Sequence, residues 1–182
     1  DDALAGRGGR LHVVSGDAVD AIPTAAHRWR ADAVYWNDDV TPYAAARDGA
    51  VSAVLGDGAH VHHGRYVHPP GSVLTRDGET YKVFTPFHRS WGELPLPARP
   101  AAGSAEIAGD PGDGLPASGE PLMEGGEAAA LRRLEAFADR VDRYRDERDR
   151  PDLDTTSRLS ADLKFGTLGP RTVIEVIGER TA

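Results

Sequence analysis

The chain has 182 residues, 40% of them hydrophobic, which is enough to bury the core of one domain or of two small ones. Its formal net charge of −8 argues against a surface dominated by nucleic-acid phosphate contacts, which need clustered Lys and Arg, so any DNA site must be local. Without cysteine, disulfides and thiolate metal sites are excluded. No apolar stretch is long enough to span a bilayer, and the acidic start is unlike a signal peptide, so we expect a cytoplasmic protein without a membrane partner.

Short apolar runs alternate with amphipathic segments from residue 10 to about residue 91. This alternation predicts an α/β fold with a partial Rossmann-like parallel sheet and flanking helices. Thr41 followed by Pro42 predicts the start of one helix, and Gly56 its end. In an earlier helix, Pro23 is tolerable only within the first turn. The expected strands are 11–14, 33–37 and 60–63, and the expected helices are 19–29 and 42–55.

The composition changes at about residue 92, where Pro and Gly become dense and periodicity disappears. Residues 92–126 are therefore expected to be an interdomain linker. Apolar residues then recur on one face of an expected helix from Glu127 to Arg148, which Pro151 ends. Pro170 opens a further expected helix. The predicted domains are 1–91, a partial α/β domain, and 127–182, the start of an all-helical domain.

Three hydroxyls and a guanidinium stand within five positions at Thr156, Ser157, Arg158, Leu159 and Ser160. An apolar repeat follows the run, so we expect it to lie at a helix start. Hydroxyls and backbone N–H groups there can donate to pyrophosphate oxygens, and the guanidinium adds charge complementarity. The alternative is that Thr156 or Ser157 only caps the helix while Arg158 lies in solvent.

Two blocks make the chain resemble the DNA photolyase and cryptochrome family over nearly its whole length, as an internal fragment. One is GSVLTRDGETYKVFTPFHRSW, residues 71–91, which resembles the end of the amino-terminal antenna-type α/β domain and is expected to be structural. The other is residues 144–171, which include the hydroxyl and guanidinium run. The resemblance implies that the all-helical domain binds flavin.

The resemblance also implies residue roles. The residues matching its flavin adenine dinucleotide (FAD) contacts are Tyr144, Thr156, Ser157, Arg158, Leu159 and Ser160. Arg148 matches a basic contact to damaged DNA, with an ordinary charged helix face as the alternative. No catalytic residue and no metal ligand are expected within this span.

For the parent protein, the resemblance implies a monomeric deoxyribodipyrimidine photolyase. Such an enzyme splits cyclobutane pyrimidine dimers by electron transfer from photoexcited reduced FAD. The fragment alone is expected to be inactive and to bind flavin poorly, because one wall of a cavity leaves the cofactor in water. One alternative is a cryptochrome-type blue-light photoreceptor, and another is a non-catalytic α/β module that binds a nucleotide or transfers electrons.

Some residues depart from the family pattern. Tyr43 and Ala44 stand where folate-using relatives carry an Asn-Glu pair, so a folate antenna is not supported, and a second antenna chromophore of another identity stays open.

His60 and His62 are expected to be surface imidazoles on an edge strand rather than metal ligands. Asp38 and its neighbour Asp39 are expected to be loop acids or helix-start charges.

Overall fold

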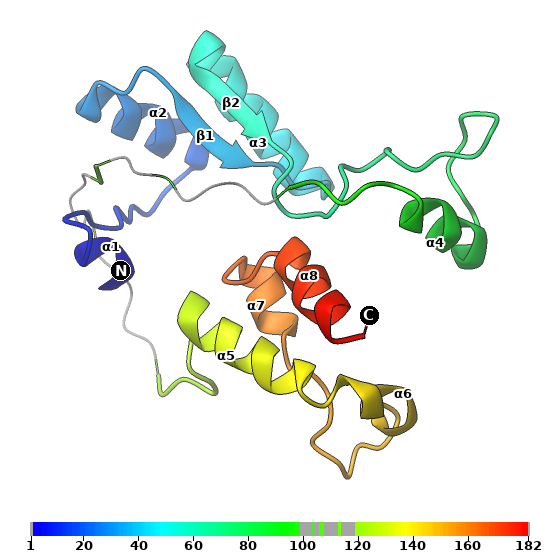
Figure 1. The fold of residues 1–182 in the computed structure, drawn as a ribbon. Coiled ribbons are helices and arrows are strands. Elements are labelled where there is room, and N and C mark those ends of the chain that lie inside the picture. The colour runs from blue at the N-terminus through cyan, green and yellow to red at the C-terminus, as the bar shows by residue number, and fades with distance from the viewer. Residues whose placement is uncertain (1, 99–102, 104–105, 108–112, 114–118, 182) are drawn as a thin grey trace. The chain divides into compact units, whose positions relative to one another are not determined.

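The computed structural model describes residues 2–98, 103, 106, 107, 113 and 119–181 (Figure 1). The chain divides into two compact units. The first comprises Asp1–His62 and Pro100–Pro121, and the second comprises His63–Arg99 and Leu122–Ala182. The predicted α/β class is confirmed, with a small parallel sheet and flanking helices.

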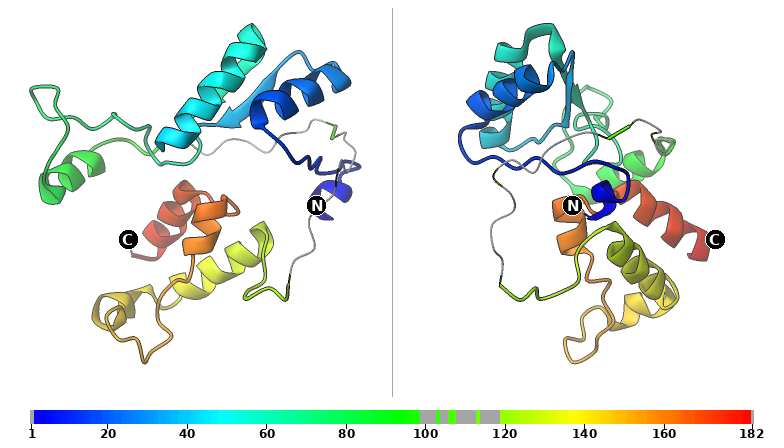
Figure 2. Two further views of the ribbon diagram at one scale, coloured as in Figure 1. Left: turned by 180° about the vertical axis from the view of Figure 1, so that it is seen from behind. Right: turned by 90° about the vertical axis from the view of Figure 1, so that its left-hand side faces the viewer.

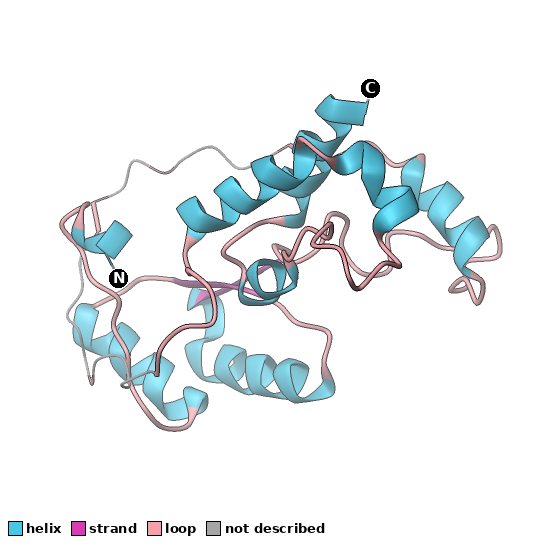
Figure 3. Cartoon of the chain, turned by 90° about the horizontal axis from the view of Figure 1, so that it is seen from below, coloured by secondary structure: helices cyan, strands magenta, loops and turns pink. Residues whose placement is uncertain are grey.

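The first unit is built on two parallel strands, β1 (Val34–Asn37) and β2 (Ala59–His62). Val34 pairs with Ala59 and Asn37 with His62, so the strands are in register along their whole length. The helices α2 (Ala18–Trp29) and α3 (Pro42–Leu55) pack against each other beside the strands (Figures 2 and 3). The short helices of this unit are α1 (Asp2–Ala5) and the 3-10 turn η1 (Gly56–Gly58).

Helix ends in this unit lie where the sequence predicts them. Thr41 precedes α3, and its Oγ1 accepts from the Ala44 N–H at 3.4 Å, while Pro42 is the first helical residue. Asp17 caps α2 in the same way, since its carboxylate accepts from the Val19 N–H at 3.0 Å. Gly56 follows the last residue of α3 at a φ of 57°, a left-handed value that favours glycine.

Two expectations for this unit are wrong. Residues 11–14 do not form a regular strand: Val13 makes an isolated bridge, its carbonyl accepting from the Asp113 N–H at 2.6 Å. A segment becomes a regular strand only when it hydrogen-bonds along its length to a neighbouring strand. The described sheet consists of β1 and β2, so residues 11–14 have no such neighbour in it. Pro23 lies in the second turn of α2 rather than the first, and the helix continues through it because α2 packs along α3.

The second unit is helical. Its elements are α4 (Phe84–Gly92), α5 (Glu127–Ala138), η2 (Val141–Arg143), α6 (Tyr144–Glu147), α7 (Ser160–Phe165) and α8 (Pro170–Thr181). The buried cluster is Ala130 and Leu134 from α5 with Leu159 and Leu168, and Val173, Val176 and Ile177 of α8 pack against it. This core holds α5, α7 and α8 together, as Figure 1 shows in yellow-green, orange and red.

The expected helix from Glu127 to Arg148 is interrupted. Helix α5 ends at Ala138, and Arg140 leaves the helical region with φ −129° and ψ 13°. The break is accompanied by a contact between Phe137 and Tyr144, whose rings meet edge to face with centroids 5.5 Å apart. In an uninterrupted helix, seven residues would separate these two positions by about 10 Å along the axis. The break therefore brings Tyr144 back onto the end of α5.

A partly buried ion pair joins α5 to α7. Arg133 on α5 donates from Nε to Asp162 Oδ2 at 3.1 Å and from Nη2 to Oδ1 at 2.7 Å. Only 4% of the Asp162 side chain is exposed. The hydrogen bonds from Arg133 are the main cause that lowers the pKa of Asp162. The pair is therefore charged at neutral pH.

The core of the second unit predicts a large effect for Leu134, which is fully buried. We expect Leu134→Ala to lower the free energy of unfolding by about 2–5 kcal/mol, because the change removes buried methyl groups and leaves a cavity. Urea unfolding measures this loss. Leu122→Ala is the matched control, since Leu122 is fully exposed, and an equal loss in both variants would contradict the packing described.

Candidate functional site

The hydroxyl and guanidinium run lies on the loop between α6 and α7 and leads directly into α7. Within the run, Leu159 is buried, with 3% of the residue exposed. It belongs to the apolar cluster formed with Ala130, Leu134 and Leu168. Ser160, the next residue, begins α7. The run is thus attached to the core of the second unit through the side chain of its fourth residue.

The polar side chains of the run lie at the surface. Thr156 and Ser160 are exposed, and Ser157 is half-buried with its Oγ 3.5 Å from the Leu159 N–H. Neither Thr156 nor Ser157 caps α7, because the N-cap residue is Leu159 and no side-chain cap bond is formed. Thr156 and Ser157 therefore do not cap α7, whereas Arg158 lies in solvent as that alternative expected, with 68% of its side chain exposed.

Arg158 has an unusual backbone conformation. Its φ is 53°, in the left-handed region that non-glycine residues adopt at a cost of about 1–2 kcal/mol. Its Nε lies 2.9 Å from Asp154 Oδ1, and both side chains are about two-thirds exposed at 68% and 64%. The guanidinium is held at the surface by an exposed ion pair, which stabilises little and exchanges readily.

The structure brings the loop next to the helix of Tyr144. Thr155 Oγ1 donates to the backbone carbonyl of Glu147, the last residue of α6, at 3.3 Å. Tyr144 is the first residue of α6, and its side chain is 39% exposed. Sequence reasoning missed Thr155, although its hydroxyl, directly before those of Thr156 and Ser157, was a visible signal. The loop and Tyr144 are therefore attached to opposite ends of one short helix.

Arg148 follows α6 and is exposed, with 57% of its side chain accessible. Its Nε lies 3.7 Å from Asp149 Oδ2, which is a loose contact. Its neighbour Arg150 differs, since it donates to both carboxylate oxygens of Asp152 at 2.8 and 2.6 Å. Arg148 is the more readily available of the two to an incoming phosphate.

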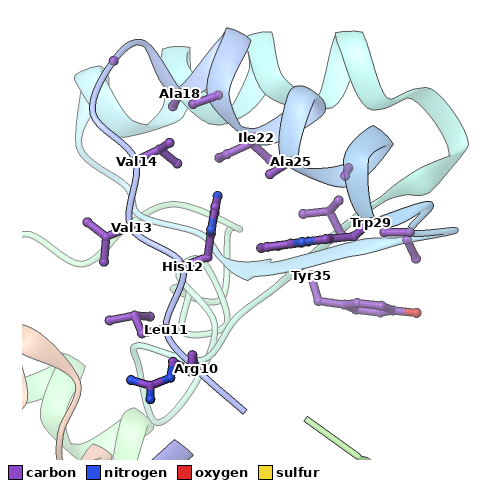
Figure 4. A pocket seen from close by; sticks show the side chains of 16 residues that line it. Arg10, Leu11, His12, Val13, Val14, Ala18, Ile22, Ala25, Trp29 and Tyr35 are labelled. Carbon is purple, nitrogen blue, oxygen red and sulfur yellow. The ribbon is translucent and has the colours of Figure 1, made fainter. Parts of the chain in front are cut away.

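The first unit has a pocket of its own. It has a volume of about 780 Å³, and its lining comes from residues 10–35. Figure 4 shows His12 and Trp29 pointing toward each other beneath α2, with ring centroids 4.6 Å apart. The two rings are seventeen residues apart in sequence, so no local pattern indicates this contact.

His60 and His62 make ring contacts at the surface, and Asp39 makes a hydrogen bond at a helix start. His60 and His62 lie on an exposed face of β2 and stack on Tyr35, with ring centroids 4.8 and 5.8 Å from it, which confirms surface imidazoles. Asp39 Oδ1 accepts from the Thr41 N–H at 3.0 Å, as expected of a helix-start acid. Within the described parts of the chain, no group of three or more His, Asp or Glu is arranged to hold a metal ion.

None of the helices formed by the described residues is both long enough and apolar enough to cross a bilayer.

Comparisons with known proteins agree with the fold. A family model described as DNA photolyase matches residues 1–103. An uncharacterized 31.6 kDa protein of Synechococcus sp. PCC 6716 is 40% identical over 94% of this chain and 66% of its own length. The deoxyribodipyrimidine photo-lyase of Synechococcus sp. PCC 6301 is 35% identical over 90% of this chain and 38% of its own length.

A solved structure agrees as well. The class III photolyase of Agrobacterium tumefaciens superposes with a TM-score of 0.83 and 29% identity, over 96% of this chain and 40% of that protein. This chain thus spans about two fifths of the length of the photolyases it matches. A family match over more than half of the residues, joined to this fold, identifies the chain as a member of the DNA photolyase family.

Proposed function

We propose that the parent protein of this chain is a light-dependent DNA repair enzyme, a deoxyribodipyrimidine photolyase that splits cyclobutane pyrimidine dimers. The observation that carries the proposal is the 35% identity with the Synechococcus photolyase over 90% of this chain, which spans both compact units. Residues 1–91 are proposed to be the antenna-type domain, 92–126 a linker and 127–182 the start of the flavin-binding domain, a division that differs from the compact units, in which His63–Arg99 belongs to the second unit. The parent is proposed to act as a monomer.

The chemistry of the 156–160 run fits FAD. Thr156 and Ser160 present exposed hydroxyls that can donate to pyrophosphate oxygens, and the exposed guanidinium of Arg158 complements the negative charge. The side chain of Leu159 is buried in the core, so Leu159 can contact the cofactor only through its backbone groups. When bound, the reduced flavin supplies, after excitation by light, the electron that opens the cyclobutane ring of the dimer.

Tyr144 supports the same proposal from the other end of α6. The residue is 39% exposed and its ring is held by the edge-to-face contact with Phe137, so it offers a fixed aromatic surface to a planar cofactor. The carbonyl of Glu147 holds Thr155, which keeps the loop and α6 together. The chain contributes the positions of these groups, and further parts of the parent must exclude water from the cofactor.

Arg148 is proposed to contact the DNA backbone. A guanidinium on a phosphate positions a duplex without reading its sequence, which suits an enzyme directed to a lesion rather than to a base sequence. A dimer stacks poorly on its neighbours, so extruding it from the duplex toward the active site costs less than extruding a normal base.

The proposed activity has a direct test. The purified, flavin-loaded parent should restore dimer-containing DNA under blue or near-ultraviolet light and leave it unrepaired in the dark, as counted by loss of dimers. A correctly folded, flavin-loaded parent that repairs nothing in the light would reject the proposal and favour the cryptochrome alternative.

The proposed flavin contact of Arg158 predicts weaker cofactor binding in Arg158→Gly. Glycine accepts the φ of 53° without strain, so the change removes the guanidinium and leaves the loop path intact. Since a charge-assisted hydrogen bond contributes about 1.5–3 kcal/mol, we expect flavin affinity in the parent to fall about 10-fold or more. Flavin titration followed by fluorescence measures the change. Arg150→Gln is the control, and equal affinity in both variants would exclude Arg158 from the site.

The DNA contact of Arg148 makes a salt-dependent prediction. In the parent, Arg148→Gln should weaken binding to damaged DNA of any flanking sequence and reduce the slope of log affinity against log salt by about one. Arg150→Gln should change the slope less, because Arg150 is already engaged by both oxygens of Asp152. If the Arg148 variant kept the slope of the unaltered parent, the residue would belong to an ordinary charged helix face.

A further inference from the structure

The ion pair between α5 and α7 includes Asp162, which follows the last residue of the hydroxyl and guanidinium run by two positions. Asp162 is the third residue of α7, and it follows Leu159 by three positions, so the two lie on one face of the chain as it enters α7. Both are buried, at 4% and 3% exposure. Leu159 is held by apolar packing, and Asp162 by the two-pronged contact with Arg133.

The remaining polar atoms of the pair are satisfied by neighbouring segments. Thr167 Oγ1 donates to Asp162 Oδ1 at 3.0 Å, beyond the end of α7. On the other side, Arg133 Nη1 donates to the backbone carbonyl of Glu124 at 2.9 Å, ahead of α5. One ion pair thus ties together two helices and the segments that flank them.

Stability alone is a weak reason for such a pair. Taking charged groups out of water is costly, and the attraction between them often only balances that cost. What a two-pronged guanidinium–carboxylate contact adds is orientation, because its planar geometry allows one arrangement. Helix α7 has six residues, so fixing its third residue and the residue before its first leaves it no freedom to rotate.

We infer that Arg133 and Asp162 are positioning residues that set the direction of α7 and thereby hold residues 156–160 in the conformation the flavin requires. The inference rests on the proposed function of that run. It also explains how Arg158 keeps a left-handed φ: the chain is fixed on its carboxyl side by Leu159 and Asp162 together. The lowered pKa of Asp162 agrees, since the carboxylate is charged at neutral pH.

The chain offers a matched pair for the test. Arg132, the neighbouring residue on α5, pairs with Glu124 at 2.7 Å, but 58% and 71% of these side chains are exposed. In the parent protein, the double variant Arg133→Met with Asp162→Leu replaces the buried pair by apolar groups. The control is Arg132→Met with Glu124→Leu.

We expect the buried-pair variant to unfold at a urea concentration near that of the parent yet to release flavin at least 10-fold faster, with a changed circular dichroism of the flavin band. The control should release flavin at the rate of the parent. Arg133→Lys keeps the charge but not the planar contact, so it should release flavin at an intermediate rate. A folded buried-pair variant with unchanged flavin release and spectrum would overturn the inference.

A second readout separates this inference from the proposed function and covers a double variant that fails to fold. Amide hydrogen exchange at residues 157–160 in flavin-free Arg133→Lys should be at least 5-fold faster than in the flavin-free parent, because the loop loses its support whether or not flavin binds. If these amides exchange at the rate of the parent, the positioning role is overturned. If exchange accelerates in a parent that never binds flavin, the positioning role holds and the flavin proposal fails.

Discussion

The burial of Leu159 is the constraint on which the proposed site depends. With one side chain of the run in the core, the residues on either side of it must face outward, and their polar groups are presented to solvent. Burying a leucine contributes about 1.5–3 kcal/mol, which offsets the about 1–2 kcal/mol that a left-handed residue such as Arg158 costs. The packing of Leu159 in the core therefore also exposes the polar side chains of the loop. The contact of Arg133 with Asp162 sets the direction of α7 and with it the orientation of those side chains.

Local signals in the sequence predict much of the fold. Thr41 and Pro42 start α3 and Gly56 follows its end, because caps, proline and glycine act through the backbone of their immediate neighbours. The expected strand at 11–14 is absent because a strand exists only beside a partner, which its own residues do not encode. The break after Ala138 was not predicted either, because the apolar spacing continues past it, and Phe137 meets Tyr144 only after the chain turns.

The candidate site divides in a similar way. The sequence alone shows the residue types of the run and its resemblance to a flavin-binding segment. It does not show which of these residues is buried and which has an unusual backbone conformation. That Leu159 is an anchor and Arg158 left-handed follows from packing. The contact between Arg133 and Asp162 joins positions 29 residues apart on two helices, and neither residue is among the predicted site residues. Such long-range polar contacts have no period or spacing that sequence reasoning can detect.

The most direct measurement of this account is amide hydrogen exchange of the parent protein with and without FAD. If residues 156–160 form part of the cofactor site, flavin should slow exchange at these amides and at the start of α6, and leave the amides of α2 and α3 in the first unit unchanged. Equal exchange at residues 156–160 in the flavin-loaded and flavin-free protein would contradict the account, because a loop that binds the pyrophosphate must lose motion when the cofactor is present.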